Sequence, residues 1–136
     1  MKRPAKKSIP DTNTIIRYLV KDDDGLYAKA KAFFDNVKTG SEKVIVLESV
    51  IAECIYVLTR IYKVPREKAS ASLTGILHYK GVANEDREEL IRALVLFSER
   101  KLDIVDCILC AKADGPDVHL FSFDDQLNRI SASGKR

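Results

Sequence analysis

The chain has 136 residues, of which 46% are hydrophobic and 32% are charged. This is the size of one ordinary domain, with enough apolar material for a core and enough charge for solubility. The net charge of +3 permits a polyanionic partner without requiring one, because many small domains carry that much. We therefore expect a single domain over residues 1–136, with flexible tails at 1–7 and 131–136.

Membrane and secretory classes are not supported by the sequence. No apolar run approaches the roughly 20 residues that a membrane span needs, and the basic start is not followed by an apolar signal segment. Three cysteines, an odd number without a secretory signal, indicate reduced thiols. These observations predict a cytoplasmic protein that does not contact the membrane.

The first half of the chain alternates helical and β-like patterns. Apolar residues at 15–20 have helical spacing, and the run 22–25 breaks that helix and caps the next one. A second apolar stripe extends over 26–37. A compact β-like run at 44–47 then leads into a helix with a stripe at 50–61.

The second half repeats the alternation. Pro65 favours a helix start, and apolar residues at helical spacing follow it. Residues 84–86 open another helix, and Asp103 is placed as the N-cap of a helix that ends before Gly115. Residues 118–123 have the clearest strand pattern in the chain. Strands separated by helices predict an α/β fold with a parallel sheet.

Four acidic residues fall where such a fold places functional groups, at the carboxyl ends of strands or early in the helices that follow. They are Asp11, Glu53, Asp106 and Asp124. Carboxylates that converge on one crevice repel one another unless a cation joins them. Oxygen ligands suit Mg²⁺ or Mn²⁺, which support metal-assisted phosphodiester hydrolysis.

Each of these four positions also has a purely structural interpretation. Asp11 and Asp124 could be N-caps, and Asp106 could complement the dipole of its own helix. Glu53 could be an ordinary surface residue. Spacing alone leaves both interpretations open, because the chain has 20 Asp and Glu residues.

Four segments in order resemble the acidic motifs of PIN-domain proteins, in particular the VapC-like ribonuclease toxins of type II toxin–antitoxin modules. They are DTNTIIRYL at 11–19, VIAECIYVL at 50–58, LDIVDCILCA at 102–111 and FSFD at 121–124. The resemblance extends from Asp11 to about Leu127, nearly the whole chain. It implies a PIN-like three-layer α/β/α fold, in which helices flank a short parallel sheet, and a Mg²⁺- or Mn²⁺-dependent ribonuclease.

The resemblance also implies roles for individual residues. Three carboxylates would hold the metal ion, namely Asp11, Asp106 and Asp124. Glu53 would complete the acidic site by coordination, directly or through water, or by orienting the attacking water. Two residues, Asn13 and Ser122, would position carboxylates through hydrogen bonds. Asp103 is either the N-cap or an additional acidic group.

The first strand departs from the family pattern, which has an apolar strand before the first Asp. Here residues 6–10 are polar and include Pro10, which cannot donate a ladder hydrogen bond. We therefore expect this strand to be very short or weakly paired. Ser122 stands where Thr is commoner, and it retains the hydroxyl.

Other chemistries find little support. Cys107 and Cys110 form a single CxxC inside an expected helix, so buried thiols are favoured over a zinc site. His78 and His119 are isolated. An aspartyl phosphatase would have a second Asp at the position of Asn13.

The implied partners are single-stranded or looped RNA, a small antitoxin protein that inserts an Arg or Lys into the acidic site, and a second copy of the chain. Basic residues that could hold RNA phosphates are Arg17, Arg60, Lys63 and Arg129. The stripes at 26–37 and 50–61 could form a homodimer interface or could equally pack in the core. Two alternative functions stay open: an RNA- or protein-binding module without catalysis, and an RNA-processing nuclease unconnected to a toxin–antitoxin system.

Overall fold

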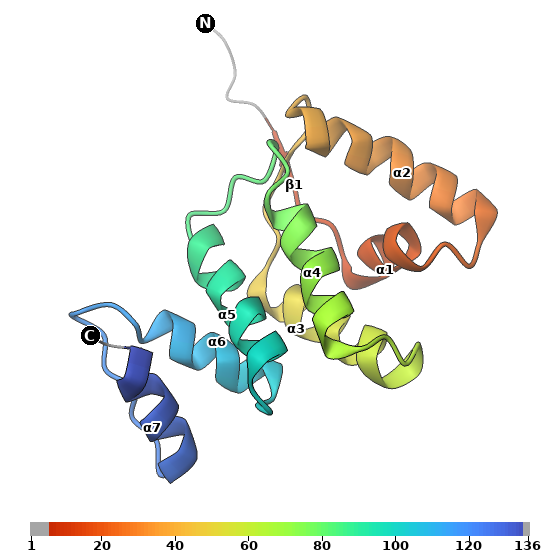
Figure 1. The fold of residues 1–136 in the computed structure, drawn as a ribbon. Helices are drawn as coiled ribbons and strands as arrows, with labels where there is room; N and C mark the ends of the chain where they lie inside the picture. The colour runs from red at the N-terminus through yellow and green to blue at the C-terminus, as the bar shows by residue number, and fades with distance from the viewer. Residues whose placement is uncertain (1–5, 135–136) are drawn as a thin grey trace, which may run out of the picture.

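The computed structural model describes residues 6–134, and it is mostly helical (Figure 1). Two short strands occur near the start of the chain, and helices account for most of the remainder. In chain order the elements are β1 (Lys7–Ser8), α1 (Thr12–Val20), α2 (Asp24–Thr39), β2 (Lys43–Val44), α3 (Glu48–Tyr56), the π-helical turn η1 (Val57–Ile61), α4 (Arg66–Leu77), α5 (Arg87–Glu99), α6 (Ile104–Lys112) and α7 (Asp125–Gly134). None of the helices within 6–134 is long and apolar enough to cross a membrane.

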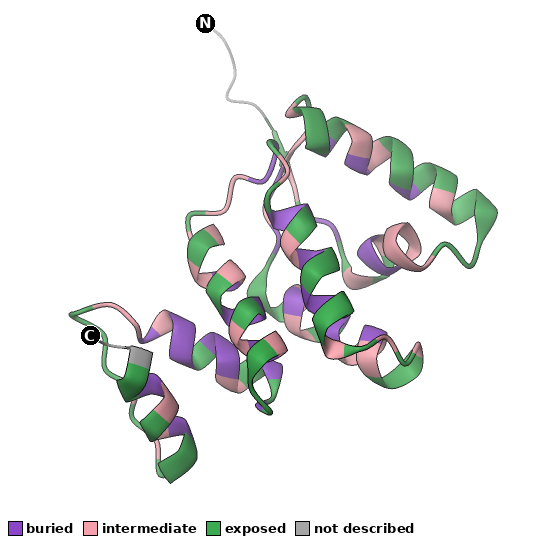
Figure 2. Ribbon diagram, viewed as in Figure 1, coloured by how far each residue is buried: buried purple, intermediate pink, exposed green. Residues whose placement is uncertain are grey.

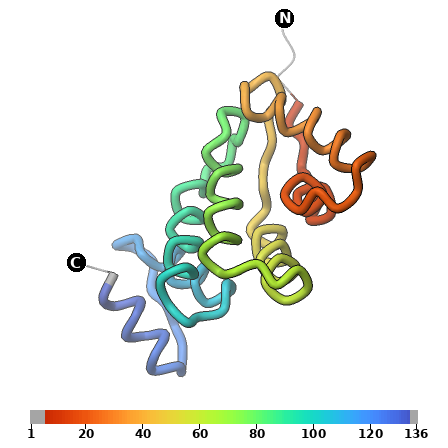
Figure 3. Tube along the Cα trace, turned by 45° about the vertical axis from the view of Figure 1, so that its right-hand side comes forward, coloured from red at the N-terminus to blue at the C-terminus, as the bar shows by residue number. Residues whose placement is uncertain are grey.

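The predicted parallel sheet is present but minimal. β1 pairs with β2 in parallel, with Lys7 opposite Lys43 and Ser8 opposite Val44. A third segment joins through one parallel bridge between Val44 and Val82. Helices α1 and α2 lie on one side of these strands and α4 and α5 on the other (Figures 1 and 3). The short sheet flanked by helices is thus confirmed, with a middle layer much smaller than the α/β pattern predicted.

A glycine is required where the end of α2 meets the strands. The Gly81 N–H donates to the Val37 carbonyl at 2.7 Å, and the Gly81 carbonyl accepts from the Val44 N–H at 2.9 Å. A Cβ at position 81 would lie 2.0 Å from the Glu42 carbonyl oxygen. Any side chain here would force the backbone segments apart, so Gly81 fixes how α2 leads into β2.

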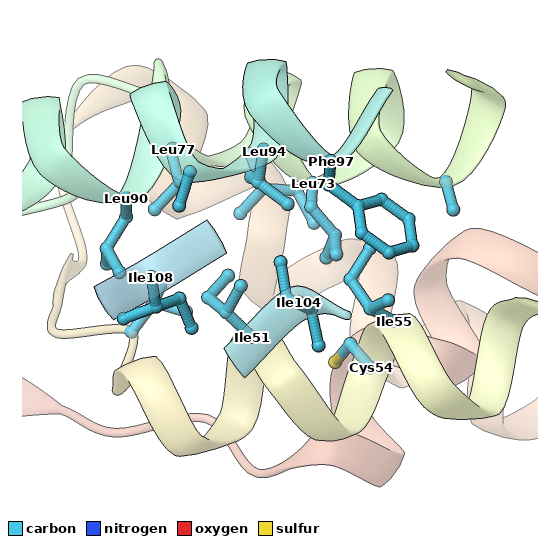
Figure 4. Close-up of a cluster of buried hydrophobic side chains, with 14 of the residues drawn as sticks. Ile51, Cys54, Ile55, Leu73, Leu77, Leu90, Leu94, Phe97, Ile104 and Ile108 are labelled. Atoms are coloured by element: carbon cyan, nitrogen blue, oxygen red, sulfur yellow. The ribbon is translucent and has the colours of Figure 1, made fainter. Parts of the chain in front are cut away.

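The core lies between α3, α4, α5 and α6 (Figure 4). Ile51 and Ile55 of α3 face Leu73 of α4, with Leu94 of α5 and Ile104 of α6 in the same cluster. The stripes at 26–37 and 50–61 point mainly into this core and its extension under α2. Core packing therefore accounts for most of the two stripes, whereas Leu26 and Ile61 are exposed, and a homodimer interface stays a prediction.

The helices predicted from periodicity are confirmed, and several begin and end where the sequence signals suggested. Asp23 caps α2 by accepting a hydrogen bond from the Leu26 N–H at 3.0 Å. Gly40 ends that helix with φ 89°, a left-handed conformation that favours glycine. The helix expected over the stripe 50–61 changes from α to π geometry at Val57.

The strand predicted at 118–123 is wrong. These residues are extended but form no strand, and the Phe121 and Phe123 side chains are 79% and 92% exposed. The alternating pattern favours a β conformation, but a strand also needs a neighbouring edge, and the turn at 113–117 directs this segment along α6 and α7 instead (Figure 2). Exposed positions predominate along it.

Both ends of the described chain contain regular structure inside the expected tails. Lys7 belongs to β1, and residues 131–134 continue α7. Leu127 and Ser131 of α7 are buried, and the helix packs on α6. Residues 1–5 and 135–136 of the expected tails lie outside the described residues.

Candidate active site

Asp11 is the N-cap of α1. Its Oδ1 accepts hydrogen bonds from the Thr14 N–H at 2.9 Å and from the Thr14 hydroxyl at 2.7 Å. These bonds, the backbone one first, lower the pKa of Asp11 below its ordinary value. The sequence fixes this arrangement locally, because an Asp before a helical run caps the free N–H groups of the first turn. Asp11 is therefore an exposed carboxylate that stays ionised at neutral pH.

Glu53 lies close to Asp11 across a buried thiol. The side chain of Glu53 is exposed on α3, and the next residue, Cys54, is fully buried. The pKa of Cys54 is raised to about 12, mainly by burial and also by the charges of Glu53 and Asp11, while a hydrogen bond with Thr12 lowers it. Because both carboxylates act on one thiol, the packing of α1 on α3 brings Asp11 and Glu53 into the same neighbourhood.

Asp106 belongs to a second acidic group. It lies in the first turn of α6 and is partly buried. Burial raises the pKa of Asp106, and the negative charges of Asp103 and Asp124 raise it further. Asp103 occupies the N-cap position of α6, but its side chain makes no capping hydrogen bond. The alternative role, an additional acidic group beside Asp106, fits this geometry better than a cap.

Ser122 contacts the backbone of Asp124, not the carboxylate that the resemblance implied it would position. The Asp124 N–H donates to the Ser122 hydroxyl at 3.0 Å, and the Asn128 side chain donates to the Ser122 carbonyl at 2.8 Å. Asp124 Oδ1 accepts from the Leu127 N–H at 3.0 Å at the start of α7. Asp124 is thus oriented by its own helix and by Ser122.

Asn13 is exposed on α1, and within residues 6–134 its side chain makes no hydrogen bond to a carboxylate. Asp11 is held by Thr14 instead. Thr14 is therefore the residue that positions the Asp11 carboxylate, and the sequence motifs did not identify it. Its signal was available, because a hydroxyl three residues after an N-cap Asp can bond back to the carboxylate.

The charges of the acidic residues act in two groups, Asp11 with Glu53 on Cys54, and Asp103 with Asp124 on Asp106. Within residues 6–134, no three His, Cys, Asp or Glu side chains lie close enough together to hold a metal ion. The donor chemistry nevertheless fits a hard divalent cation, since Asp106 is partly buried beside two further carboxylates and no counter-charge contributes to its pKa. The convergence of all four carboxylates on one ion stays a prediction.

Arg66 positions the loop that leads into α6. Its guanidinium donates to the carbonyl oxygens of Phe97 at 2.9 Å, Arg100 at 2.8 Å and Leu102 at 2.7 Å. It also lies 3.5 Å above the Phe97 ring. These contacts fix the backbone immediately before Asp103 and Asp106. Nothing in the sequence around position 66 signals this role, because the acceptors are carbonyls more than 30 residues away.

A second cation joins three helices on the far end of α6. Lys112 contacts Asp86 at 2.8 Å, Glu89 at 2.9 Å and Glu48 at 3.5 Å. Burial alone would lower the pKa of Lys112, but the hydrogen bonds to Asp86 and Glu89 raise it. Asp86 and Glu89 are at the start of α5 and Glu48 is at the start of α3, so this cluster ties α6 to both.

The basic residues considered for RNA binding are used in different ways. Arg17 pairs with Asp22 at 2.8 Å, and the Arg60 guanidinium lies 4.8 Å from the Tyr56 ring centroid. Lys63 is exposed, with a positive φ of 57°. Arg129 and Arg100 line one groove of about 380 Å³ between α5 and α7. Arg100 lies three residues before Asp103 in the chain and Arg129 five after Asp124, but neither aspartate lines the groove.

The cysteines are buried and reduced, as predicted. Cys107 and Cys110 have no disulfide partner, and burial raises the pKa of the Cys107 thiol to about 12. Burial likewise raises the pKa of Cys110. Both thiols are therefore protonated at neutral pH and pack as small apolar groups.

Comparisons with known proteins identify the family of the chain. The PIN domain matches residues 8–133 of the chain. A VapC ribonuclease of Aquifex aeolicus (strain VF5) is 30% identical over 104 residues, which is 76% of this chain and 76% of that protein. No solved structure matches the chain. The match over nearly the whole chain shows that the protein belongs to the PIN-domain family and is a distant homologue of a VapC ribonuclease.

Proposed function

We propose that the protein is a Mg²⁺- or Mn²⁺-dependent ribonuclease that hydrolyses RNA phosphodiester bonds. The observation that carries this proposal is the state of Asp106, a partly buried carboxylate beside Asp103 and Asp124 whose pKa is raised by burial and by those two charges. A carboxylate held in this way costs folding free energy, and such groups concentrate at functional sites. Membership of the PIN-domain family and similarity to a VapC ribonuclease support the same activity.

Asp106, Asp124 and Asp11 are the proposed metal ligands, and Glu53 completes the acidic surface. A divalent ion bound by these carboxylates would polarise the phosphate and activate water. The helices give each carboxylate a defined direction: Asp11 through Thr14, Asp124 through the Leu127 N–H, and Asp106 through the first turn of α6. Glu53 is exposed and close to Asp11, where it can accept a proton from water or orient it.

RNA phosphates next to the cleaved one would meet basic side chains. Arg129 is the best placed of the four that the sequence suggested, because it shares a groove with Arg100. Guanidinium groups bind phosphate through paired hydrogen bonds. Arg17 and Arg60 are already engaged with Asp22 and Tyr56, so they are weaker candidates.

The decisive experiment is cleavage of a mixed RNA pool by purified protein with Mg²⁺, with Mn²⁺ and with EDTA. Asp106→Asn is the test variant, and Asp35→Asn is the matched control, since Asp35 pairs with Lys31 on the surface of α2. We expect metal-dependent cleavage that survives Asp35→Asn and disappears in Asp106→Asn. No cleavage, together with no divalent-metal binding, would leave an RNA- or protein-binding module instead.

We further propose that the enzyme acts in the cytoplasm as the toxin of a toxin–antitoxin pair. The similarity to a VapC ribonuclease supports this role. An antitoxin would place an Arg or Lys among the ionised carboxylates, and a second copy of the chain would form a homodimer. Growth arrest on expression of the parent chain, absent with Asp106→Asn, tests the toxin role. An RNA-processing nuclease would cleave one host transcript without arresting growth.

A further inference from the structure

Two aromatic side chains are exposed directly before the acidic group. Phe121 is 79% exposed and Phe123 is 92% exposed, and their ring centroids lie 5.5 Å apart at an interplanar angle of 75°. Burying a Phe ring is strongly favourable, so two rings left outside the core call for an explanation. The packing gives none, because α7 buries Leu127 and Ser131 against the body while both rings stay outside.

A hollow of about 420 Å³ adjoins Phe121. Four residues whose side chains can make hydrogen bonds line it, namely His119, Ser122, Asn128 and Ser131. Asn128 uses one N–H on the Ser122 carbonyl, at 2.8 Å, which leaves its carbonyl oxygen and its second N–H for a ligand. The volume is at the small end of the range for small-molecule sites. The hollow therefore combines one aromatic face with several hydrogen-bonding groups.

We propose that Phe121, Phe123 and this hollow form a subsite for an unpaired nucleobase of the RNA substrate. An aromatic face with nearby donors and acceptors is the environment in which proteins bind unstacked bases. The subsite rests on the proposed ribonuclease function, and it adds which residues would hold an unpaired base of that RNA. Ser122 links the two parts, since its hydroxyl holds the Asp124 backbone at 3.0 Å and its side chain lines the hollow.

A protein partner fits this surface less well. A stable protein interface buries about 800 Å² on each side, whereas two Phe side chains provide at most about 500 Å². The chain continues from Phe123 into Asp124, Asp125 and Gln126, all exposed, so the apolar surface ends there. A single stacked base matches the two rings in size, and the neighbouring carboxylates are where its phosphodiester would be cleaved.

The absence of tryptophan from the chain makes the test direct. Phe121→Trp and Phe123→Trp each introduce one fluorophore that can still stack on a base. Ile61→Trp is the matched control, because Ile61 is also an exposed apolar side chain, at 69%, but lies in η1. Each variant is titrated in EDTA, which prevents metal-dependent cleavage, with a single-stranded hexanucleotide and then with a duplex of the same sequence.

We expect the single strand to quench fluorescence at positions 121 and 123 and to leave position 61 unchanged, with little quenching by the duplex. Phe121→Leu and Phe123→Leu, which keep apolar bulk without a ring, should each weaken binding of the hexanucleotide by about 5- to 150-fold. The salt dependence of binding should be unchanged in both Leu variants, whereas loss of an arginine would reduce it.

Three results would overturn the subsite. The first is equal quenching by duplex and single strand, and the second is unchanged affinity in both Leu variants. The third is tryptophan fluorescence at position 121 that changes with protein concentration in the absence of RNA, together with dimer formation in sedimentation. The last would assign the rings to a second copy. The readout does not need catalysis. Quenching without any cleavage by the parent protein would refute the nuclease alone, and cleavage with unaffected Leu variants would refute the subsite alone.

Discussion

Replacing Arg66 tests whether the loop before α6 is held by one side chain. Arg66→Met keeps the aliphatic stem and removes the guanidinium, so the carbonyls of Phe97, Arg100 and Leu102 lose their donor. The Arg100 carbonyl is exposed and can bond to water instead. The carbonyls of Phe97 and Leu102 are partly buried, and leaving each without a donor costs about 1–2 kcal/mol of folding free energy. Loss of the contact with the Phe97 ring adds a cost of about 0.5–1 kcal/mol. We expect a total loss of about 2.5–5 kcal/mol.

Urea unfolding followed by far-ultraviolet circular dichroism measures this loss. With a slope of about 2 kcal/mol per molar urea, the midpoint should fall by about 1–2.5 M. The matched control is Arg92→Met, since Arg92 is 51% exposed and its ion pair with Asp114 is long, at 3.7 Å. This substitution should lower the free energy of unfolding by less than about 0.5 kcal/mol. A loss below about 1 kcal/mol for Arg66→Met would refute the reasoning, because water would then be replacing the clamp.

Three further predictions concern charge. Asp106→Asn should abolish cleavage and, without metal, raise the melting temperature at pH 7 by up to about 4 °C. The pKa of Asp106 is raised in the folded state, so ionisation of this carboxyl destabilises the fold once the pH exceeds the ordinary pKa of an aspartate. Calorimetry at pH 7 with EDTA measures the change in melting temperature. The pKa of Asp22 is shifted in the opposite direction, because hydrogen bonds from Arg17 and Tyr62 lower it. The ionised carboxylate therefore stabilises the fold above pH 3.8, and this stabilisation is lost as the pH falls through the lower pKa of the folded state. Asp22→Asn should therefore flatten the acid limb of a stability–pH curve, and an unchanged limb would contradict the pairing. Arg100→Ala and Arg129→Ala should each reduce the salt dependence of single-stranded RNA binding by about 0.7 in the log–log slope, measured by fluorescence anisotropy; Arg92→Ala should leave it unchanged.

The helices were predictable because their signals are local. An Asp at position 23, a Gly at position 40 and a Pro at position 65 mark helix boundaries through the backbone of their own neighbours. The strand at 118–123 failed for the converse reason, since pairing depends on an edge supplied by a distant part of the chain. Helix α7 was missed because it is polar on average, and its apolar face consists chiefly of Leu127 and Ile130.

The residues of the candidate site also divide into those with a local sequence signal and those whose role depends on distant parts of the chain. Asp11 and Asp124 were identified by their place after an expected strand and by the motif resemblance, and the structure shows each accepting a hydrogen bond at a helix start. The grouping of Asp103 with Asp106 and Asp124 depends on how α7 packs on α6, and no single segment encodes it. Arg66 depends on three distant carbonyls, so only the folded chain shows what it does.

The buried thiols give the protein built-in probes of its own local opening. Cys54 and Cys107 are fully buried, and burial raises the pKa of each to about 12. Because the thiolate is the reactive form, an aqueous disulfide reagent modifies them only while the surrounding helices are apart. Cys54 lies under Asp11 and Glu53, so its modification rate reports how often α1 separates from α3. A ligand that bridges the two acidic groups would slow that reaction by the same factor by which it stabilises the closed site.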